Sequence, residues 1–199
     1  MTDPAESAAV AKDELREGLL FRRRARPAAE RAAAADAVAS ALLVGLRGVG
    51  TLAAFVPDPS EPGCGRLPDA YTELGARVLL PVVPSQGRVL DWAVYTGELE
   101  PGRFGLLHPA GPRLGATAIQ AADVVVVPAL AVDRFGIRLG RGGGYYDRAL
   151  VHARPDAVLV TIVFDDERLA ELPREAHDRP VTAVVTPSGG WQELVPRDG

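Results

Sequence analysis

The chain has 199 residues, 47% of them hydrophobic, which is enough for a single domain that buries its core without disulfides or a structural metal. Its formal net charge of −4 at pH 7 argues against a nucleic-acid partner, because such proteins present strongly basic surfaces. Cys64 is the only cysteine in the sequence, which excludes an internal disulfide and a cysteine-based zinc cluster and indicates a reducing compartment.

The apolar stretches of the sequence are too short for a secretory signal or a membrane span. Residues 1–17 mix acidic, basic and alanine residues and lack an apolar core. The most apolar run, residues 124–132, contains Pro128 and is far shorter than the roughly 20 residues needed to cross a bilayer. We therefore expect a cytoplasmic protein without a membrane partner, and a monomer, with a dimer left open.

Two helices are predicted over residues 6–26 and 27–46. Leucine and valine side chains recur at near-helical spacing in the first, and Pro27 suits the first position of the second. We expect residues 1–46 to form a helical segment that packs on the rest of the domain. Lys12, on the first helix, is the only lysine in the chain.

A cluster of arginines ends the first predicted helix: Arg22, Arg23, Arg24 and Arg26. Cations at this position suit the negative end of the helix dipole. Two interpretations are open, a solvated helix terminus and a phosphate site, and the residue pattern favours the solvated terminus.

Strand and helix patterns alternate through the rest of the chain. Strands are predicted at residues 51–56, 77–83, 89–95, 124–127, 157–164 and 181–186, and helices at residues 69–75, 145–153 and 166–172. Residues 57–68 form a loop rich in proline and glycine. The apolar, β-branched run at residues 124–127 is typical of a central strand covered on both faces.

This alternation predicts an α/β fold, in which an open, mostly parallel twisted sheet has helices on both faces, a three-layer αβα arrangement. In such sheets, ligands bind beyond the carboxyl ends of the strands. One domain spanning residues 1–199 is expected, because no repeat or low-complexity linker divides the chain.

The glycine-rich segment at residues 136–147 follows the predicted central strand and has the sequence Gly-Ile-Arg-Leu-Gly-Arg-Gly-Gly-Gly-Tyr-Tyr-Asp. Glycines allow positive φ angles, so the backbone amides of such a segment can converge on a phosphate group. A helix that begins at Tyr145 would add its positive dipole end. Arg138 and Arg141 supply forked donors for phosphate oxygens, and Asp147 supplies oxygens that suit Mg²⁺.

The segment matches neither a Walker A loop, since Lys12 lies far upstream, nor a dinucleotide-binding fingerprint, whose glycines directly open a crossover helix. Spacing alone leaves two interpretations open: a phosphate-binding loop, and a tight turn between strand and helix with two tyrosines packed in the core. Asp133, just before the segment, is a further candidate to orient an arginine.

Two strings of residues resemble the signature of the 5-formyltetrahydrofolate cyclo-ligase family, also called methenyltetrahydrofolate synthetases. They are Pro-Ala-Leu-Ala-Val-Asp at residues 128–133 and Arg-Leu-Gly-Arg-Gly-Gly-Gly-Tyr-Tyr-Asp-Arg at residues 138–148. Lys12 and Arg16, one helical turn apart, resemble the family's N-terminal Lys-x-x-x-Arg pair. Asp178 lies in a segment that is similar to the family's metal-binding segment.

The resemblance implies a site for ATP and Mg²⁺. The implied ATP-binding residues are Lys12, Arg16, Arg138, Gly140, Arg141, Gly142, Gly143, Gly144, Tyr145 and Tyr146. Asp147 and Asp178 would hold Mg²⁺. Lys12, Arg141 and Asp147 would act in catalysis. His177 is expected to shape the loop of Asp178 rather than to act as a base.

The resemblance also implies a folate site. Glu61 resembles the family's substrate-binding acid in the loop after the first strand. The other implied substrate-binding residues are Val56, Trp92, His108, Gly143 and Tyr145. Trp92 and Phe104 are candidates to stack on the pterin ring, although aromatic residues at strand positions more often belong to a core. The family usually has an acidic or amide residue at the position of His108 and an aspartate at that of Thr182.

The implied activity is the ATP- and Mg²⁺-dependent conversion of 5-formyltetrahydrofolate into 5,10-methenyltetrahydrofolate, with release of ADP and phosphate. Such phosphoryl transfer depends on positioning and charge neutralisation, so no Ser-His-Asp or Cys-His constellation is needed. Two other functions stay open. One is a non-catalytic member that binds folate or nucleotide, suggested by His108 and Thr182, and the other is a sugar-phosphate isomerase or ligand-sensing domain on a similar sheet.

Overall fold

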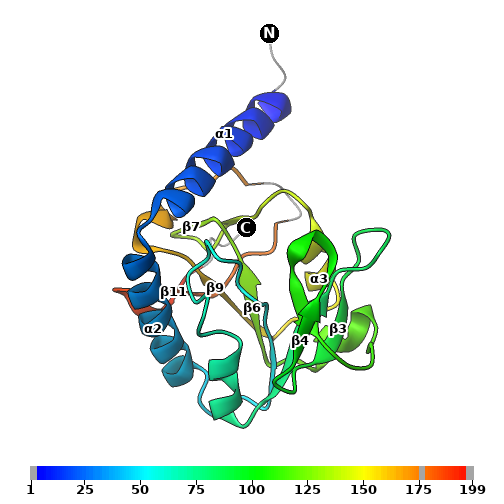
Figure 1. Ribbon diagram of the computed structural model, residues 1–199. Coiled ribbons are helices and arrows are strands. Elements are labelled where there is room, and N and C mark those ends of the chain that lie inside the picture. The colour runs from blue at the N-terminus through cyan, green and yellow to red at the C-terminus, as the bar shows by residue number, and fades with distance from the viewer. Residues whose placement is uncertain (1–3, 175–177, 196–199) are drawn as a thin grey trace.

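The computed structural model describes residues 4–174 and 178–195, and within them a seven-stranded sheet lies between two layers of helix (Figure 1). The strand order is β12-β11-β9-β6-β1-β2-β3. The strands are β1 (Thr51–Ala53), β2 (Arg77–Val82), β3 (Asp91–Val94), β6 (Val124–Pro128), β9 (Val158–Ile162), β11 (Ala183–Thr186) and β12 (Gly190–Glu193). The inner strands are parallel to one another, whereas the edge strands β3 and β12 run antiparallel to their neighbours. The predicted α/β class with a mostly parallel sheet is confirmed.

β6 is the middle strand of the sheet, as its run of valines predicts. All four of these valine side chains are buried. Because successive side chains of a strand point to opposite faces, Val124 and Val126 join the core on one face, and Val125 and Val127 join the core on the other. The sheet is therefore covered on both sides, as parallel strands require.

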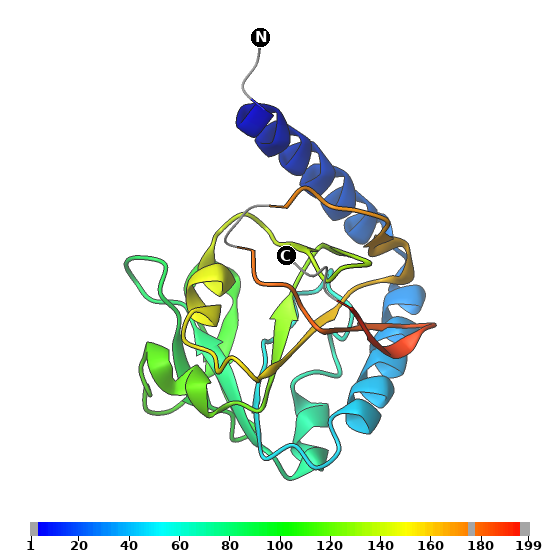
Figure 2. The same cartoon turned by 180° about the vertical axis from the view of Figure 1, so that it is seen from behind.

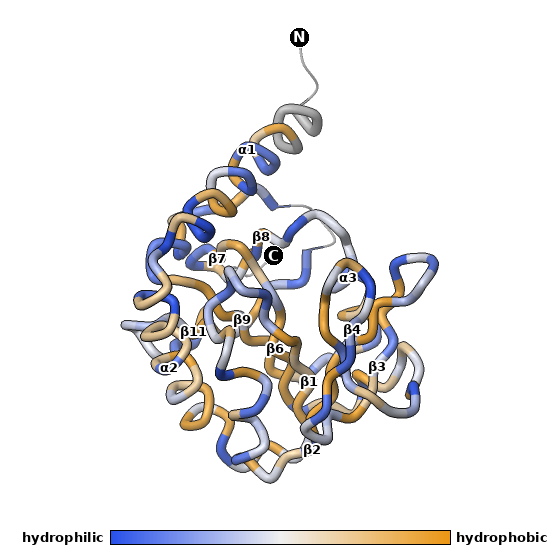
Figure 3. Tube along the Cα trace, viewed as in Figure 1, coloured by the Kyte–Doolittle hydropathy of each residue, from blue (hydrophilic) through white to orange (hydrophobic). Residues whose placement is uncertain are grey.

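Different helices cover the two faces of the sheet. α2 (Ala28–Gly45) and the 3₁₀ helix η1 (Asp69–Leu74) pack on one face. The 3₁₀ helix η3 (Ala116–Ala121) and α3 (Tyr145–Leu150) pack on the other. Figure 1 shows α2 and α3 on opposite sides of β6, and Figure 3 shows hydrophobic residues gathered along the strands between them.

The first helix, α1 (Pro4–Ala25), projects beyond the sheet at its N-terminal end, as Figures 1 and 2 show. Leu19 of this helix packs on a three-stranded sheet of order β10-β7-β8. These strands are β7 (Ala131–Asp133), β8 (Arg138–Leu139) and β10 (Arg168–Leu169). The small sheet therefore contacts α1 and also contains the start of the glycine-rich segment.

The helix predicted at residues 166–172 is wrong. The chain there forms the short 3₁₀ helix η4 (Asp165–Glu167), which is followed directly by β10. The carboxylate of Glu167 accepts hydrogen bonds from the backbone N–H of Phe164 and from the side chain of Arg23, so it faces the interior and not the solvent. A long-range partner thus overrides the local helical pattern.

The sequence does not predict the hairpin of β4 (Leu99–Pro101) and β5 (Leu107–Pro109), which the 3₁₀ helix η2 (Arg103–Gly105) connects. Runs of three residues are too short to show an alternating pattern. Helix α3 is also shorter than predicted, and η1 is a 3₁₀ helix instead of an α-helix. The single domain spanning residues 1–199 stays a prediction. In the described part of the chain, no helix combines the length and the apolar character needed to cross a membrane.

Gly45, the last residue of α2, lies against the indole ring of Trp191 in β12. A Cβ at this position would lie 2.3 Å from the ring. We expect Gly45→Ala to lower the free energy of unfolding by roughly 1–3 kcal/mol, because the helix and the ring must separate. Gly18→Ala in α1 is the matched control, since nothing lies within 4 Å of its Cβ position.

The control variant should gain about 0.5–1 kcal/mol from helix propensity. Urea unfolding followed by circular dichroism measures both variants. Equal free energies of unfolding for the two would contradict the contact between α2 and β12.

Candidate active site

A cavity of about 920 Å³ opens beyond the carboxyl ends of β1, β2 and β6. Phe55 and Val56 follow β1, Val83 follows β2 and Ala129 follows β6, and all of them line the cavity. The strand order places this opening at a switch point, because β2 lies on one side of β1 and β6 lies on the other. Loops leaving β1 and β6 diverge at such a point, where open α/β sheets bind their ligands.

Most residues that the sequence assigns to a site line this cavity. From the predicted nucleotide and metal sites these are Lys12, Arg16, Arg138, Gly140, Arg141, Gly142, Gly143, Gly144, Tyr145, Tyr146, Asp147 and Asp178. From the predicted folate site they are Val56, Glu61, His108, Gly143 and Tyr145. The fold thus brings together α1, the loop after β1, the β4–β5 hairpin and the glycine-rich segment. The ligand that each residue contacts stays a prediction.

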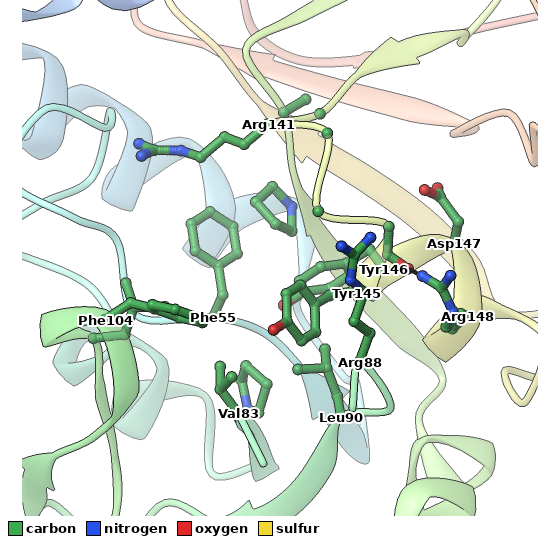
Figure 4. Close-up of a pocket in the computed structure, with 18 of the residues that line it drawn as sticks. Phe55, Val83, Arg88, Leu90, Phe104, Arg141, Tyr145, Tyr146, Asp147 and Arg148 are labelled. Atoms are coloured by element: carbon green, nitrogen blue, oxygen red, sulfur yellow. Dashed lines mark hydrogen bonds between the residues drawn. The ribbon is translucent and has the colours of Figure 1, made fainter. Parts of the chain in front are cut away.

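Trp92 is not part of the cavity wall, and its predicted contact with the substrate is wrong. Its side chain in β3 is fully buried in the core that also contains Ile119. A side chain without exposed surface cannot stack on a ligand. Phe55 and Phe104 are the phenylalanines that line the cavity, and Figure 4 shows both on one side of it, across from Tyr145. No residue pattern marks Phe55 as a site residue, although its place directly after β1 is a usable signal.

A buried carboxylate and a glycine hold the start of the glycine-rich segment. Oδ1 of Asp133 accepts hydrogen bonds from the backbone N–H groups of Phe135 at 2.8 Å and Ile137 at 2.9 Å. Asp133 therefore shapes the turn between β7 and β8 and does not orient a cavity arginine. Gly136 has a φ of 83°, and its C=O accepts a hydrogen bond from the N–H of Val181 at 2.8 Å. A Cβ on Gly136 would lie 2.1 Å from the Val181 C=O oxygen, so only glycine fits.

The glycine turn, residues 140–144, lies against α1. Nε of Arg16 donates a hydrogen bond to the C=O of Gly140 at 3.0 Å. Gly142 and Gly144 have φ angles of 84° and 66°, and Gly144 immediately precedes α3. Such angles are accessible to glycine without steric cost and let successive backbone N–H groups face one side.

The two tyrosines after the turn have different surroundings. Tyr145 packs on the core beneath α3 and borders the cavity. Tyr146 packs against the cores on both sides of the sheet, and within the described residues its buried Oη has no hydrogen-bond partner. Burial, and then the negative charge of Glu61, raises the pKa of Tyr146. The glycine-rich segment is therefore a tight turn whose tyrosines pack on the core, and it also forms one wall of the cavity.

Arg138 lies between two carboxylates at the edge of the cavity. Its Nη2 is hydrogen bonded to Asp147, and its Nη1 donates to the C=O of Arg179 at 3.0 Å. Burial lowers the pKa of Arg138, whereas the charges of Asp147 and Asp178 oppose this shift. Both predicted metal ligands thus act on the same guanidinium and line the same cavity, although they are far apart in the sequence.

Among the residues that the structure describes, no three or more His, Cys, Asp or Glu side chains are arranged to hold a metal ion. Mg²⁺ is commonly held by one or two carboxylates together with substrate phosphates and water. Asp147 and Asp178 supply that number of carboxylates beside the glycine turn. His177, next to Asp178, lies outside the described residues.

Arg141 links the glycine turn to the acidic loop after β1. Its Nη2 donates hydrogen bonds to Asp58 and, at 3.3 Å, to Oε1 of Glu61. Oε2 of Glu61 accepts a hydrogen bond from the backbone N–H of Asp58 at 3.0 Å. Burial, and then the charge of Asp58, raises the pKa of Glu61, and Arg141 opposes this shift. Glu61 is thus a buried acid at the cavity, where burial and Asp58 disfavour its ionised form and Arg141 favours it.

The two positions that depart from the expected family pattern have different surroundings. His108, in β5, lines the cavity, and its Nδ1 lies 3.4 Å from Oε1 of Glu100. Oγ1 of Thr182 instead donates a hydrogen bond to the C=O of Leu159 at 3.2 Å. The departure at His108 therefore borders the cavity, whereas Thr182 lies directly before β11 and outside the cavity wall.

Glu61 gives a testable pH dependence of stability. Because its pKa is raised in the folded protein, the unfolded chain ionises this carboxyl at a lower pH than the folded chain does. The stability that Glu61 contributes is present below its unfolded pKa of about 4.5 and is lost as the pH rises through the folded value. We expect the wild type to lose stability relative to Glu61→Gln over this range. Chemical unfolding of both proteins at a series of pH values tests this, and a pH-independent difference would contradict it.

Comparison with known proteins identifies one family. Residues 8–187 match the sequence model of the 5-formyltetrahydrofolate cyclo-ligase family. The chain is 47% identical over 185 residues to the 5-formyltetrahydrofolate cyclo-ligase of Mycolicibacterium smegmatis, which covers 90% of this chain and 95% of that protein. It is 33% identical over 148 residues to the Escherichia coli protein of the same name, covering 71% and 80%. The NMR structure of Aquifex aeolicus 5,10-methenyltetrahydrofolate synthetase matches with a TM-score of 0.76 at 29% sequence identity, and 94% of each chain is covered. The chain therefore belongs to the 5-formyltetrahydrofolate cyclo-ligase family.

Proposed function

We propose that the chain converts 5-formyltetrahydrofolate into 5,10-methenyltetrahydrofolate in a reaction that consumes ATP, requires Mg²⁺ and releases ADP and phosphate. Cyclo-ligase activity follows from its family. The observation that carries the finer proposal is the meeting of Lys12, the glycine turn and Glu61 in one cavity. We further propose a single-domain monomer in the cytoplasm, as the sequence leads us to expect.

The nucleotide half of the cavity consists of α1 and the glycine turn. Lys12 and Arg16 lie one helical turn apart and so share a face of α1, and Arg16 contacts the turn at Gly140. We expect the guanidinium of Arg141 and the backbone N–H groups of residues 142–144 to bind triphosphate oxygens. Cations and amides in this arrangement neutralise the charge that moves during phosphoryl transfer.

Asp147 and Asp178 would hold Mg²⁺ at the edge of the same half. When bound, the ion would supply neutralisation of the triphosphate's negative charge. The chain keeps both carboxylates near Arg138, which is hydrogen bonded to Asp147 and feels the charge of Asp178. Ionised carboxylates are the forms that bind a divalent cation.

The folate half of the cavity lies around Glu61 and the aromatic residues. We expect the Glu61 carboxylate to accept hydrogen bonds from the pterin ring, and Phe55 and Phe104 to pack on it. Held in this way, the formyl oxygen attacks the γ-phosphorus of ATP, and ADP leaves. The second folate nitrogen then attacks the formyl carbon, the bond from this carbon to the phosphate oxygen breaks, and the nitrogen releases its proton to the departing phosphate or to water, which closes the ring. Alignment of the two substrates in one cavity supplies much of the rate enhancement.

A direct assay tests this function. The absorbance of the 5,10-methenyl product should rise when ATP and Mg²⁺ are added to the purified protein with 5-formyltetrahydrofolate. Binding of both ligands without turnover would support the non-catalytic alternative, for which His108 at the cavity wall is the motivating residue. Calorimetry that detects no uptake of adenine nucleotide with any divalent ion would exclude both.

We expect Lys12→Ala to raise the KM for ATP roughly 10- to 100-fold, because a hydrogen bond to a charged group contributes about 1.5–3 kcal/mol. The KM for 5-formyltetrahydrofolate should change far less. Arg47→Ala is the control, since Arg47 is an exposed cation outside the cavity wall. Steady-state kinetics with each substrate varied in turn measures both effects. An equal change in the two KM values would argue against a nucleotide contact for Lys12.

We expect Asp147→Asn to raise the Mg²⁺ concentration needed for half-maximal activity by at least about tenfold, because an amide binds the ion more weakly than a carboxylate. The kcat at saturating Mg²⁺ should also fall. Asp156→Asn, an exposed carboxylate outside the cavity wall, is the matched control. The measurement is a Mg²⁺ titration of the reaction rate, and superimposable titrations of the two variants would count against the metal assignment.

A further inference from the structure

Arg23 is a fully buried arginine that lies behind the cavity. It belongs to α1, about three helical turns after Lys12. Its side chain has an exposure of 0%, and it is not among the residues that line the cavity. The solvated helix terminus that the sequence favours for the arginine cluster is therefore wrong for Arg23, whereas the neighbouring Arg22 and Arg24 are exposed.

Glu167 and Ala129 fix the orientation of this guanidinium. Oε1 of Glu167 accepts a hydrogen bond from Nε at 2.7 Å, and Oε2 accepts one from Nη2 at 2.7 Å. The C=O of Ala129 accepts a further hydrogen bond from Nη2 at 2.8 Å. A two-bond pairing of this kind fixes the angle of the guanidinium plane as well as its distance.

The third nitrogen of Arg23, Nη1, points to Glu61. It lies 3.9 Å from Oε1 of Glu61. Within the described residues, this buried Nη1 has no hydrogen-bond partner. A buried N–H group without a partner costs free energy, and proteins retain few of them. Nη1 lies behind the Glu61 carboxylate, where its positive charge can act on that group.

Glu61 faces two cations that differ in their exposure to solvent. The side chain of Arg141 is 48% exposed, whereas that of Arg23 is 0% exposed. Asp58 and the buried hydroxyl of Tyr146 face the same carboxylate. When Arg141 turns to the triphosphate, as the proposed function requires, Arg23 is the cation that stays beside Glu61.

We propose that Arg23 is a positioning residue for the folate half of the cavity: held from behind by Glu167, it fixes the Glu61 carboxylate in place through Nη1. This inference rests on the proposed function, because it assumes that Glu61 contacts the folate. Arg23 touches neither substrate and acts through Glu61 alone. Its loss should therefore affect folate binding and leave nucleotide binding intact.

The variant that tests this is Arg23→Met/Glu167→Gln. Removing both charges together leaves no unpaired buried ion, so the fold should survive. We expect the KM for 5-formyltetrahydrofolate to rise about tenfold, while the KM for ATP changes by less than about twofold. The acid limb of kcat/KM for the folate should move to higher pH, because Glu61 loses a cation that favours its ionised form.

Two further variants complete the test. Arg24→Met, which removes the exposed neighbouring cation, should match the wild type in both KM values. Arg23→Lys keeps a cation behind Glu61 but lacks the fork that pairs with Glu167, so its folate KM should lie between those of the wild type and the double variant. If the double variant does not fold, Arg23→Lys carries the test alone.

An unchanged folate KM with an unchanged pH profile in a folded Arg23 variant would overturn the inference. Equal rises in both KM values would also overturn it, because they would indicate a general structural role. Failure of the proposed function gives a different result, since the wild type itself would then show no ATP-dependent turnover. In that case, calorimetric titration of wild type and variants with 5-formyltetrahydrofolate still decides the role of Arg23, and equal affinities would refute it.

Discussion

The parallel strands at the centre of the sheet are buried on both faces, and this constraint determines where charge lies in the molecule. Side chains from β6 alternate between two apolar cores, and burying an unpaired ion in either core would cost a large free energy. Charged side chains therefore collect beyond the strand ends, where the loops after β1 and β6 diverge. Those loops carry Glu61 and the glycine turn, so the sheet holds the groups of the proposed site.

Helix α1 is the element that this sheet does not position directly. It brings Lys12 and Arg16 to the cavity, and it is held instead by Leu19 on the small sheet and by the buried pair of Arg23 and Glu167. A buried ion pair contributes little net stability, but leaving either partner alone costs about 3–5 kcal/mol. A helix that slipped by one residue would leave both charges unpaired. The pair thus disfavours a shifted register of α1 in the wild type, whereas Leu19 on the small sheet and the hydrogen bond of Arg16 to Gly140 hold the two cations at the glycine turn independently of the pair.

Local patterns predict much of this fold. The preference of the β6 valines for a buried strand and of the following glycines for a tight turn does not depend on residues far away in the sequence. Lys12 likewise stands out by residue type alone. Trp92 and Arg23 could not be placed in this way. Whether an aromatic residue of a strand faces a cavity depends on which helix covers that face, and an arginine is buried only where a carboxylate meets it. For Arg23 that carboxylate is Glu167, 144 residues away along the chain. The incorrect prediction of a helix at residues 166–172 has the same cause, because the pairing of Glu167 with Arg23 is not visible in the local sequence.

Gly136 does not line the cavity, yet its backbone joins two stretches of the chain that are far apart in sequence. Its backbone contact with Val181 couples the stretch that begins at Arg138 to the stretch that contains Asp178. A larger residue would displace the Val181 carbonyl and with it the stretch that contains Asp178, without altering Asp178 itself. In natural variants of this family, a substitution of Gly136 is thus expected to act like a change at the proposed metal ligands and not like a neutral change in a surface turn. We therefore expect a substitution of Gly136 to be tolerated only together with a change in the backbone around Val181.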